Sequence, residues 1–438
     1  MRIAYISAGA AGMYCGACLH DNTLAAALLR KGHQVALIPT YTPIRTDEVD
    51  VSLPQVFYGG INVYLQQKSA LFRKTPWFLD RILDHPGLLN MLSRLSSSTD
   101  ASDLGALTIS ILHGEEGNQR KELEKLVTWL KAQFAPQLVQ LTNSMLAGLA
   151  RELKRELGVP VLSALQGEDI FLEGLTEPHR SEILELLRER CRDVDGFIAT
   201  SRYYADFMSG YLDISREKIH VVNLGIKLEG FGQVDHAAGK VPFVIGYLAR
   251  VCPEKGLHLL ADALHRIAGK VGREKVFLKA AGYLGKRDRP YLERILAQLE
   301  SWKLLDRFEY LGEIDRRQKL DFLKSIDVLS VPTTYHEPKG LYVLEALASG
   351  VPVVEPAHGA FPEVLEATGG GILVDPESPG ALAEGILRLL NDAGLRSKLG
   401  THGREQVNRC YNDDVMADAT LSVYSQYLTH EAASAPSV

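Results

Sequence analysis

Residues 326–332 read IDVLSVP, and residues 335–352, a short way further on, read YHEPKGLYVLEALASGVP. The first run is short, apolar and rich in branched side chains, as expected of a strand buried on both faces of a parallel sheet. Pro338 disfavours helical geometry at the residue before it, whereas apolar residues from Leu341 onwards recur at helical spacing until Gly350. The stretch therefore predicts a strand, a turn and a helix, which is the repeating unit of a doubly wound α/β fold.

Two glutamates and a glycine at this turn form a candidate ligand site. A helix that opens at Gly340 and Leu341 offers unpaired N–H groups and the positive end of its dipole, and glycine lets phosphate oxygens approach the backbone closely. Glu345, about one and a half turns into the helix, can accept hydrogen bonds from ribose hydroxyls, while Glu337 on the loop can face a sugar. The pattern favours a site for a sugar diphosphate; a surface turn with two solvated acids is the alternative.

A second strand-like run, residues 243–248, is also followed by charged side chains. Arg250 and Lys255 come after it and precede a helical pattern that begins at Leu257. Arg250 offers a planar fork of donors for phosphate, and Lys255 supplies a mobile point charge. Together they would neutralise the charge of a leaving diphosphate. The alternative is that both are ordinary cations scattered on the surface.

The combination of these residues resembles the retaining GT-B glycosyltransferases of family 4, the group 1 glycosyltransferases. Seven residues separate Glu337 from Glu345, as in the Glu-x7-Glu motif of that family. The resemblance implies that Glu337 lies beside the donor sugar and that Glu345 binds the ribose. It also implies that Arg250 and Lys255 contact the diphosphate of the donor.

The amino-terminal start carries the same resemblance, which thus spans nearly the whole chain. Residues 2–7 read as a strand, Gly9 and Gly12 lie in the loop that follows, and a helix and a second strand come next. The resemblance places Gly12 among the donor-binding residues. It implies a GT-B architecture, in which two doubly wound Rossmann-like domains face an interdomain cleft and ligands bind beyond the carboxyl ends of the strands.

Two positions depart from the family pattern. Many members have a histidine that contacts the donor sugar where this chain has Gln166, after the strand-like residues 161–165. Gln166 can form hydrogen bonds but cannot exchange a proton near neutral pH. Many members also have an aromatic residue where this chain has Lys339, so we hypothesise that Lys339 meets a charged donor or acceptor.

The alternation of strands and helices predicts the domain boundaries. A chain of 438 residues is expected to form two domains of about 200 residues each. We expect an acceptor-side domain over 1–225, a glycine-rich linker over 226–240, and a donor domain over 241–414. Residues 415–438 are predicted to form a helix that returns to the first domain, by resemblance, and a short tail.

Composition excludes several classes of function. A formal net charge of -6 argues against a dedicated nucleic-acid binder, and 46% hydrophobic with 23% charged residues is ordinary for a globular protein. No run approaches 18 uninterrupted apolar residues, and the start of the chain lacks the apolar core of a signal peptide. We therefore expect a cytoplasmic enzyme with no membrane span.

No metal or cofactor is expected beyond the donor substrate itself. Cys15 and Cys18 have the Cys-x-x-Cys spacing of metal or redox sites, but no second pair lies nearby in the sequence. We expect a loop there, followed by a helix capped near Asp21 or Asn22. The Asp-Val-Asp run at 193–195 is interpreted as a solvated turn rather than a metal motif.

Residues 43–118 interrupt the simple alternation and are predicted to be an insertion. Residues 77–95 within it combine many apolar side chains with basic ones. This is the predicted acceptor region, for a glycan, lipid-linked or small-molecule hydroxyl. Packed insertion helices, an apolar acceptor groove and docking onto a membrane surface are the three alternatives.

The motifs and the resemblance together predict transfer of a sugar from a nucleoside diphosphate to a hydroxyl, and the resemblance implies retention of anomeric configuration. Arg250, Lys255 and the amides near Gly340 and Leu341 would stabilise the departing diphosphate without a metal, and Glu337 would orient the donor hydroxyls. A nucleotide-sugar epimerase and a non-catalytic sugar-nucleotide-binding module remain as alternatives. A Rossmann dehydrogenase is less favoured, because the loop after the first strand lacks the full glycine fingerprint.

Overall fold

The structure of the protein is a computed structural model that describes residues 1–9, 15–58, 66, 101–233 and 241–434. Gly12, residues 59–65 and 67–100 of the predicted insertion, and residues 234–240 of the predicted linker lie outside the described residues. By its internal contacts the chain divides into two compact units. The first unit consists of Met1–Gly225 and Asp413–Val438, and the second of Ile226–Asn412.

The first unit is built on a six-stranded parallel sheet with the order β2-β1-β3-β4-β5-β6. Its strands are β1 (Arg2–Ser7), β2 (Gln34–Pro39), β3 (Leu138–Leu141), β4 (Val161–Leu165), β5 (Gly196–Ala199) and β6 (Ile219–Val221). The central strands β3, β4 and β5 are buried along their whole length. Near-continuous apolar runs form such strands because helices cover both faces of a parallel sheet.

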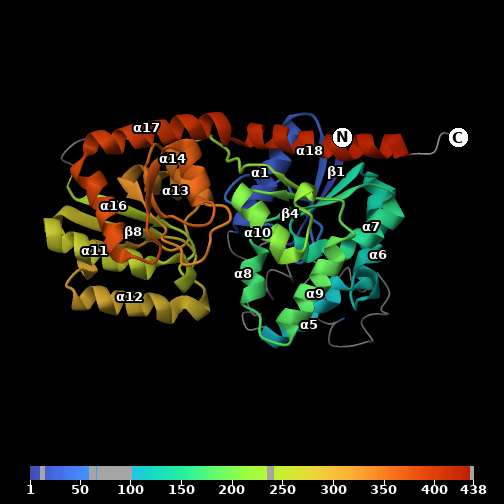
Figure 1. Cartoon of the computed structure of the whole chain (residues 1–438), viewed down its shortest axis with the longest axis horizontal. Helices are drawn as coiled ribbons and strands as arrows, with labels where there is room; N and C mark the ends of the chain where they lie inside the picture. Colours follow the sequence, from blue (N-terminus) through green and yellow to red (C-terminus); the bar gives the residue numbers. More distant parts are fainter. Residues whose placement is uncertain (10–14, 59–65, 67–100, 234–240, 435–438) are drawn as a thin grey trace. The chain divides into compact units, whose positions relative to one another are not determined.

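Helices cover this sheet on both faces. They are α1 (Gly16–Arg30), α5 (Ala101–Leu112), α6 (Arg120–Trp129), α7 (Ala150–Leu157), α8 (Glu168–Glu173), α9 (His179–Cys191), α10 (Arg202–Leu212) and α18 (Asp413–Ser434). One apolar cluster joins α1 and α18 to one face, and a second cluster joins α6, α7, α9 and α10 to the other. Figure 1 shows α18 running alongside α1, and Asp413 accepts a hydrogen bond of 2.6 Å from Arg30.

The second unit contains another six-stranded parallel sheet, with the order β12-β11-β10-β7-β8-β9. Its strands are β7 (Phe243–Leu248), β8 (Val276–Ala281), β9 (Phe308–Tyr310), β10 (Val328–Leu329), β11 (Val353–Pro356) and β12 (Gly371–Val374). The chain extends the sheet from β7 first toward β9 and then crosses to β10 on the other side of β7. The order therefore reverses at β7, which is the point where ligands bind in sheets of this kind.

The helices of the second unit alternate with these strands. They are α11 (Leu257–Val271), α12 (Arg289–Ser301), α13 (Arg316–Ser325), α14 (Leu341–Ala348), α15 (Phe361–Thr368), α16 (Pro379–Asn391) and α17 (Ala393–Cys410). Figure 1 shows α13 and α14 on one side of the sheet and α11 and α12 on the other. The helix α13 begins with a capping box in which Asp315 and Gln318 satisfy each other's backbone N–H groups.

These two units confirm the predicted fold class of two doubly wound α/β domains. The strand at 243–248 and the helix from Leu341 have the predicted positions, whereas the strand predicted over 326–332 is paired only at Val328 and Leu329. Among the residues that the structure describes, no helix combines the length and the apolar character that crossing a bilayer requires.

The described part of the predicted linker is held by side-chain contacts within the second unit. Arg316 at the start of α13 donates hydrogen bonds to the carbonyl oxygens of Lys227 at 2.9 Å and of Glu229 at 2.7 Å. Its guanidinium group also lies 5.2 Å from the ring centroid of Phe231. Residues 227–231 are therefore fixed against α13.

Candidate active site

The loops that carry the predicted charged residues leave the same edge of the second unit's sheet. β7 and β10 pair in parallel, so the chain leaves both strands at their carboxyl ends, Arg250 and Lys255 after β7 and Glu337 after β10. A backbone hydrogen bond of 2.9 Å from Thr334 to the carbonyl of Glu254 joins the two loops. Pairing of the strands thus brings side chains together that lie far apart in the sequence.

Glu337 is buried at the centre of a cluster of donors. Its Oε2 accepts hydrogen bonds from Lys255 Nζ at 2.6 Å, from the hydroxyl of Tyr335 at 2.6 Å and from that of Tyr342 at 3.2 Å. Lys255 Nζ also hydrogen bonds to the Tyr335 hydroxyl, and it lies 4.8 Å and 5.3 Å from the ring centroids of Tyr335 and Tyr342. Cation–π attraction therefore adds to the ion pair in holding the ammonium group.

The electrostatics of the cluster keep Glu337 ionised. Burial by itself would raise the pKa of Glu337, but the charge and hydrogen bond of Lys255, together with Tyr335 and the backbone N–H of Lys339, lower that pKa to about 2. Burial and the Glu337 carboxylate raise the pKa of Tyr335 and of Tyr342 well above the usual value, so both hydroxyls remain donors. Glu337 is an acceptor of hydrogen bonds throughout the neutral range.

A second buried carboxyl group, that of Glu355, has its pKa shifted in the opposite direction. Glu355 on β11 is fully buried, and its two oxygens accept only long hydrogen bonds, of 3.2 and 3.3 Å, from the N–H of Val331. Burial raises the pKa of Glu355 well above its ordinary value, and the charge of Glu337 raises it further. The pKa values of the two carboxyl groups are thus shifted in opposite directions, a division that the sequence pattern did not predict.

The helix α14 begins beside this cluster. Gly340 is its N-cap, with a φ of 70° in the left-handed region, so that the first-turn N–H groups, starting at Leu341, lie just after Glu337 in the chain. Lys339 is 8% exposed, and its backbone N–H donates to Glu337 Oε1 at 3.3 Å. The predicted positions of Lys339, Gly340 and Leu341 at a helix opening are confirmed; contact of any of them with a ligand stays a prediction.

The loop after β11 holds the backbone of Glu337 in place. The N–H of Ala360 donates to the carbonyl oxygen of Glu337 at 2.8 Å. At Gly359, whose φ is 60°, a Cβ atom would lie 2.5 Å from that carbonyl oxygen and 2.6 Å from the Glu337 nitrogen. Only glycine fits here, and this contact could not be predicted from the sequence, because it joins residues of separate loops.

Glu345, the predicted ribose ligand, forms an ion pair inside the second unit. Lys319 Nζ donates a short hydrogen bond to Glu345 Oε1, and the two side chains are each 8% exposed. The lysine belongs to α13 and the glutamate to α14. None of the sequence motifs contains Lys319, because the residues around it give no sign of a charged partner.

Arg250 is the exposed member of the site. Its carbonyl oxygen accepts a hydrogen bond of 2.9 Å from the hydroxyl of Tyr247, and the N–H of Val251 donates to the carbonyl of Tyr283 at 2.8 Å. The backbone that carries the guanidinium group is therefore anchored to β7 and to the loop after β8. Burial opposes the charge of Arg250, but the side chain of Cys252 and the carboxylates of Glu254 and Asp288 raise its pKa.

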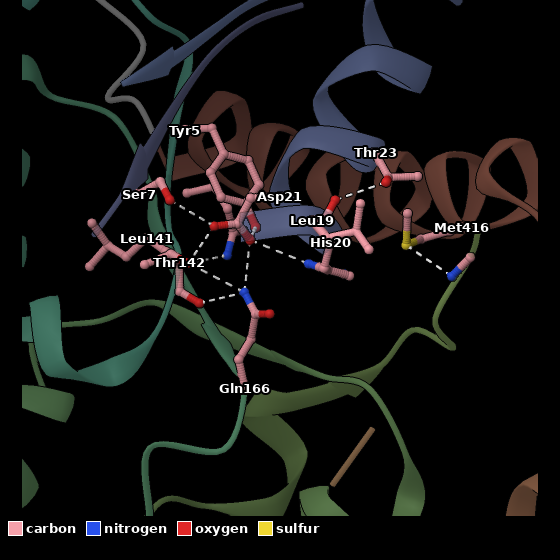
Figure 2. Close-up of polar contacts among 12 residues, drawn as sticks. Tyr5, Ser7, Leu19, His20, Asp21, Thr23, Leu141, Thr142, Gln166 and Met416 are labelled. Atoms are coloured by element: carbon pink, nitrogen blue, oxygen red, sulfur yellow. Dashed lines mark hydrogen bonds and ion pairs between the residues drawn. The ribbon is translucent and has the colours of Figure 1, made fainter. Parts of the chain in front are cut away.

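Gln166 lies in the first unit, where it belongs to a buried polar cluster around Asp21 (Figure 2). Its Nε2 donates to Asp21 Oδ1 and to the carbonyl oxygen of Thr142, both at 2.8 Å. Asp21 also accepts hydrogen bonds from Tyr5 at 2.8 Å, from Ser7 at 3.0 Å and from Thr142 at 2.5 Å. The structure thus shows Gln166 positioning Asp21, and its predicted contact with a donor sugar stays a prediction.

The same cluster corrects the predicted start of the first helix. We expected a cap near Asp21 or Asn22, but α1 begins at Gly16 with Cys15 as its N-cap, so Asp21 lies inside the helix. The carboxylate of Asp21 accepts from side chains of β1 and of the residues that directly follow β3 and β4, rather than capping N–H groups of its own helix. Burial would raise the pKa of Asp21, but His20, Thr142 and Gln166 lower it.

The acidic motif weighed as a metal site forms ion pairs within the first unit. Asp193 pairs with Arg151 at 3.1 Å, and Asp195 pairs with Lys154 at 2.6 Å and accepts the N–H of Val161 at 2.8 Å. Residues 193–195 do lie in a turn after α9, as interpreted, but their carboxylates are only partly exposed and pair with side chains of the first unit. Across the described ranges, no group of three or more His, Cys, Asp and Glu side chains is arranged to hold a metal ion.

Comparison with known families covers most of the chain. Residues 22–225 match the family described as "Glycosyl transferase 4-like domain", and residues 233–406 match the family described as "Glycosyl transferases group 1". The chain belongs to the group 1 glycosyltransferases. The second match contains the cluster around Glu337 and the Lys319–Glu345 pair, and the first contains Gln166 and all but the start of α1.

Individual relatives match only part of this chain. A glycosyltransferase of Methanocaldococcus jannaschii is 32% identical over 181 residues, which are 41% of this chain and 44% of that protein. The D-inositol 3-phosphate glycosyltransferase of Xylanimonas cellulosilytica is 30% identical over 246 residues, which are 53% of this chain and 57% of that protein. The chain thus spans less than two thirds of the length of these relatives.

Solved structures share the fold over nearly the whole chain. Sucrose-phosphate synthase from Thermosynechococcus elongatus superimposes with a TM-score of 0.70 at 20% identity, covering 98% of this chain and 99% of that one. The HepE protein of Anabaena, solved in complex with UDP, gives a TM-score of 0.68 at 17% identity, covering 97% and 100%. These likenesses confirm the predicted GT-B architecture.

Proposed function

We propose that this protein is a retaining glycosyltransferase that moves a sugar from a nucleoside diphosphate to an acceptor hydroxyl. The observation that carries the proposal is the convergence of Lys255, Glu337 and the opening of α14 at the edge of the sheet where the strand order reverses. Relatives that are named as glycosyltransferases support it, as does the HepE protein, which has been solved with UDP-glucose.

The charges of the site suit a nucleotide-sugar donor. Arg250 and Lys255 supply two cations, and the N–H groups at Gly340 and Leu341 supply the positive end of a helix. The guanidinium group of Arg250 would donate paired hydrogen bonds to the diphosphate. Lys255 would neutralise the charge that develops as the diphosphate leaves. These groups together would stabilise the departing diphosphate, and in this proposal no metal ion or other cofactor takes part.

The state of Glu337 restricts its role in the reaction. A carboxyl group with a pKa of about 2 cannot donate a proton near neutral pH. Glu337 would therefore accept hydrogen bonds from hydroxyls of the donor sugar and orient that sugar. Tyr335 and Tyr342, which donate to the same oxygen, would set the direction of the carboxylate.

Retention follows from attack on the face that the diphosphate leaves. In the proposed step the bond between the anomeric carbon and the phosphate oxygen breaks, with its electron pair going to the leaving diphosphate. The acceptor oxygen forms its bond to the same face of the anomeric carbon, and its proton passes to the phosphate oxygen. Gln166 would contact the donor sugar without exchanging a proton.

A donor-binding screen tests the proposal. A ligand that binds the folded state raises its melting temperature, so UDP-, GDP- and ADP-sugars are compared on the wild type, on Glu345→Ala and on Glu384→Ala. Glu384 is an exposed residue of α16 and serves as the control. We expect stabilisation by one nucleotide class, which is lost in Glu345→Ala and kept in Glu384→Ala; no stabilisation by any donor would contradict the proposal.

Turnover then separates the transferase from its alternatives. Incubation with the donor that binds and with glycan, lipid-linked and small-molecule hydroxyl acceptors should give a glycoside whose anomeric configuration, measured by NMR, matches that of the donor. Change of the donor sugar without an acceptor would indicate an epimerase, and binding without turnover a non-catalytic module. The inverted anomer would contradict retention.

Lys339 is proposed to select the charge of the donor or the acceptor. Lys339 is buried and directly precedes the opening of α14, where an ammonium group would favour an anionic ligand. We expect Lys339→Ala to lower turnover more with an acidic sugar donor than with a neutral one. Equal turnover of both donors by the variant and the wild type would contradict this role.

A further inference from the structure

The pair formed by Lys319 and Glu345 lies where a helix normally buries apolar side chains. Lys319, Phe322 and Leu323 are the buried residues of α13, and their spacing places them on one face of the helix. Phe322 and Leu323 contribute to the core, whereas Lys319 buries an ammonium group beside Glu345 Oε1. The other lysine of this helix, Lys324, is exposed to solvent.

A buried ion pair of this kind calls for an explanation other than stability. Removing two charges from water costs free energy that their mutual attraction repays only in part, and apolar replacements of such pairs are often neutral or stabilising. A leucine at position 319 would satisfy the helical pattern without that cost. The lysine therefore has a use that an apolar side chain would not serve.

We propose that Lys319 is a positioning residue for the recognition of the ribose of the nucleotide donor. It holds the Glu345 carboxylate in its ionised form and fixes the direction of its oxygens, so that Glu345 can accept hydrogen bonds from the 2′- and 3′-hydroxyls. This inference rests on the proposed function, in which Glu345 binds the ribose, and adds a residue on α13 that none of the sequence motifs contains.

The chemistry of a carboxyl group explains why the lysine matters. An ionised carboxylate only accepts hydrogen bonds, which matches two hydroxyl donors, and its charge strengthens those bonds. A buried carboxyl group without a cation tends to take up a proton, and one oxygen then becomes a donor. Without Lys319, Glu345 would lose a cation that favours its charge and a hydrogen bond that fixes its direction, and the preference for ribose would fall.

The test compares ribonucleotides with deoxyribonucleotides by isothermal titration calorimetry. UDP, GDP and ADP are titrated into the wild type, and the tightest of the three is then compared with its 2′-deoxy counterpart. Loss of a hydrogen bond to a charged group weakens binding by about tenfold or more, so we expect the wild type to prefer the ribonucleotide by that factor. In Lys319→Met the preference should fall to about twofold, and Lys319→Arg should restore most of it.

Controls separate this role from damage to the fold. Lys324→Met changes an exposed lysine of the same helix and should keep the preference of the wild type. The double variant Lys319→Met/Glu345→Gln should prefer ribose no less than Lys319→Met does, because both changes act on one contact. If Lys319→Met does not fold, Lys319→Gln carries the comparison, since its amide can still donate to Glu345 but has no charge.

The possible results give distinct conclusions. An unchanged ribose preference in folded Lys319→Met or Lys319→Gln overturns the inference while leaving the proposed function intact. A wild type that binds nucleotides with no ribose preference does the same. A wild type that binds none of the three nucleotides overturns the proposed function, and the inference with it.

Discussion

Lys255 Nζ lies 2.6 Å from Glu337 Oε2, although the two residues are 82 positions apart in the sequence. Both side chains are mostly buried, at 15% and 7% exposure, and the tyrosines at 335 and 342 complete the cluster. The pair links the loop after β7 to the loop after β10. It fixes the charge of Glu337 and the position of Lys255.

The coupling between Lys255 and Glu337 should be measurable in a double-mutant cycle. Lys255→Met leaves a buried carboxylate without its cation, so we expect the free energy of unfolding of the second unit to fall by about 3–5 kcal/mol. Lys255→Met/Glu337→Gln should lose less than the sum of the single changes. Urea unfolding checks this, with exposed Lys270→Met of α11 as control; additive losses would contradict the coupling.

The lowered pKa of Glu337 predicts an acid-dependent loss of stability. Its folded pKa of about 2 lies below the ordinary value of 4.5, so the group stabilises the fold above pH 4.5, and this contribution is lost as the pH falls through about 2. The full contribution is about 3 kcal/mol. Unfolding free energies measured between pH 6 and 2 should fall less steeply in Glu337→Gln than in the wild type; equal slopes would contradict the assignment.

The variant Gly359→Ala should displace the backbone of Glu337, although the two residues lie in separate loops. A Cβ atom there would overlap the backbone of Glu337, and the φ of 60° adds a cost of about 1–2 kcal/mol for a residue with a side chain. We expect a lower melting temperature and weaker binding of the donor. Gly210→Ala is the matched control, since Gly210 lies inside α10 with open space around its Cα, and the change should be neutral or stabilising.

Asp21→Asn tests the buried cluster of the first unit. The amide would bring an N–H group toward side chains that all donate to the carboxylate, so we expect a loss of about 2–3 kcal/mol in the free energy of unfolding of that unit. Asp206→Asn, at an exposed pair with Arg216, should cost less than about 1 kcal/mol. Chemical unfolding of the two variants measures these losses. Equal losses of unfolding free energy would show that the cluster around Asp21 contributes little to stability.

The local parts of the site could be predicted from the sequence. The strand before Arg250, the turn at Gly340 and the helix that carries Glu345 depend on neighbouring residues, and their positions are confirmed. The short pairing of β10 was not predictable from its apolar run, because burial and ladder pairing are separate properties. Asp21 was misread as a cap, because a cap and a buried acceptor look alike in one dimension.

The sequence by itself determined the fold class, the family and the residue types at the edge of the second sheet, because periodicity and turn chemistry are encoded over short stretches. Only the tertiary structure decided the partners: Lys255 for Glu337, Lys319 for Glu345, Gln166 for Asp21 and Gly359 for the Glu337 backbone. These contacts join elements distant in the chain. Their strength comes from burial, which strengthens an ion pair or hydrogen bond and appears only once the sheets and helices have packed.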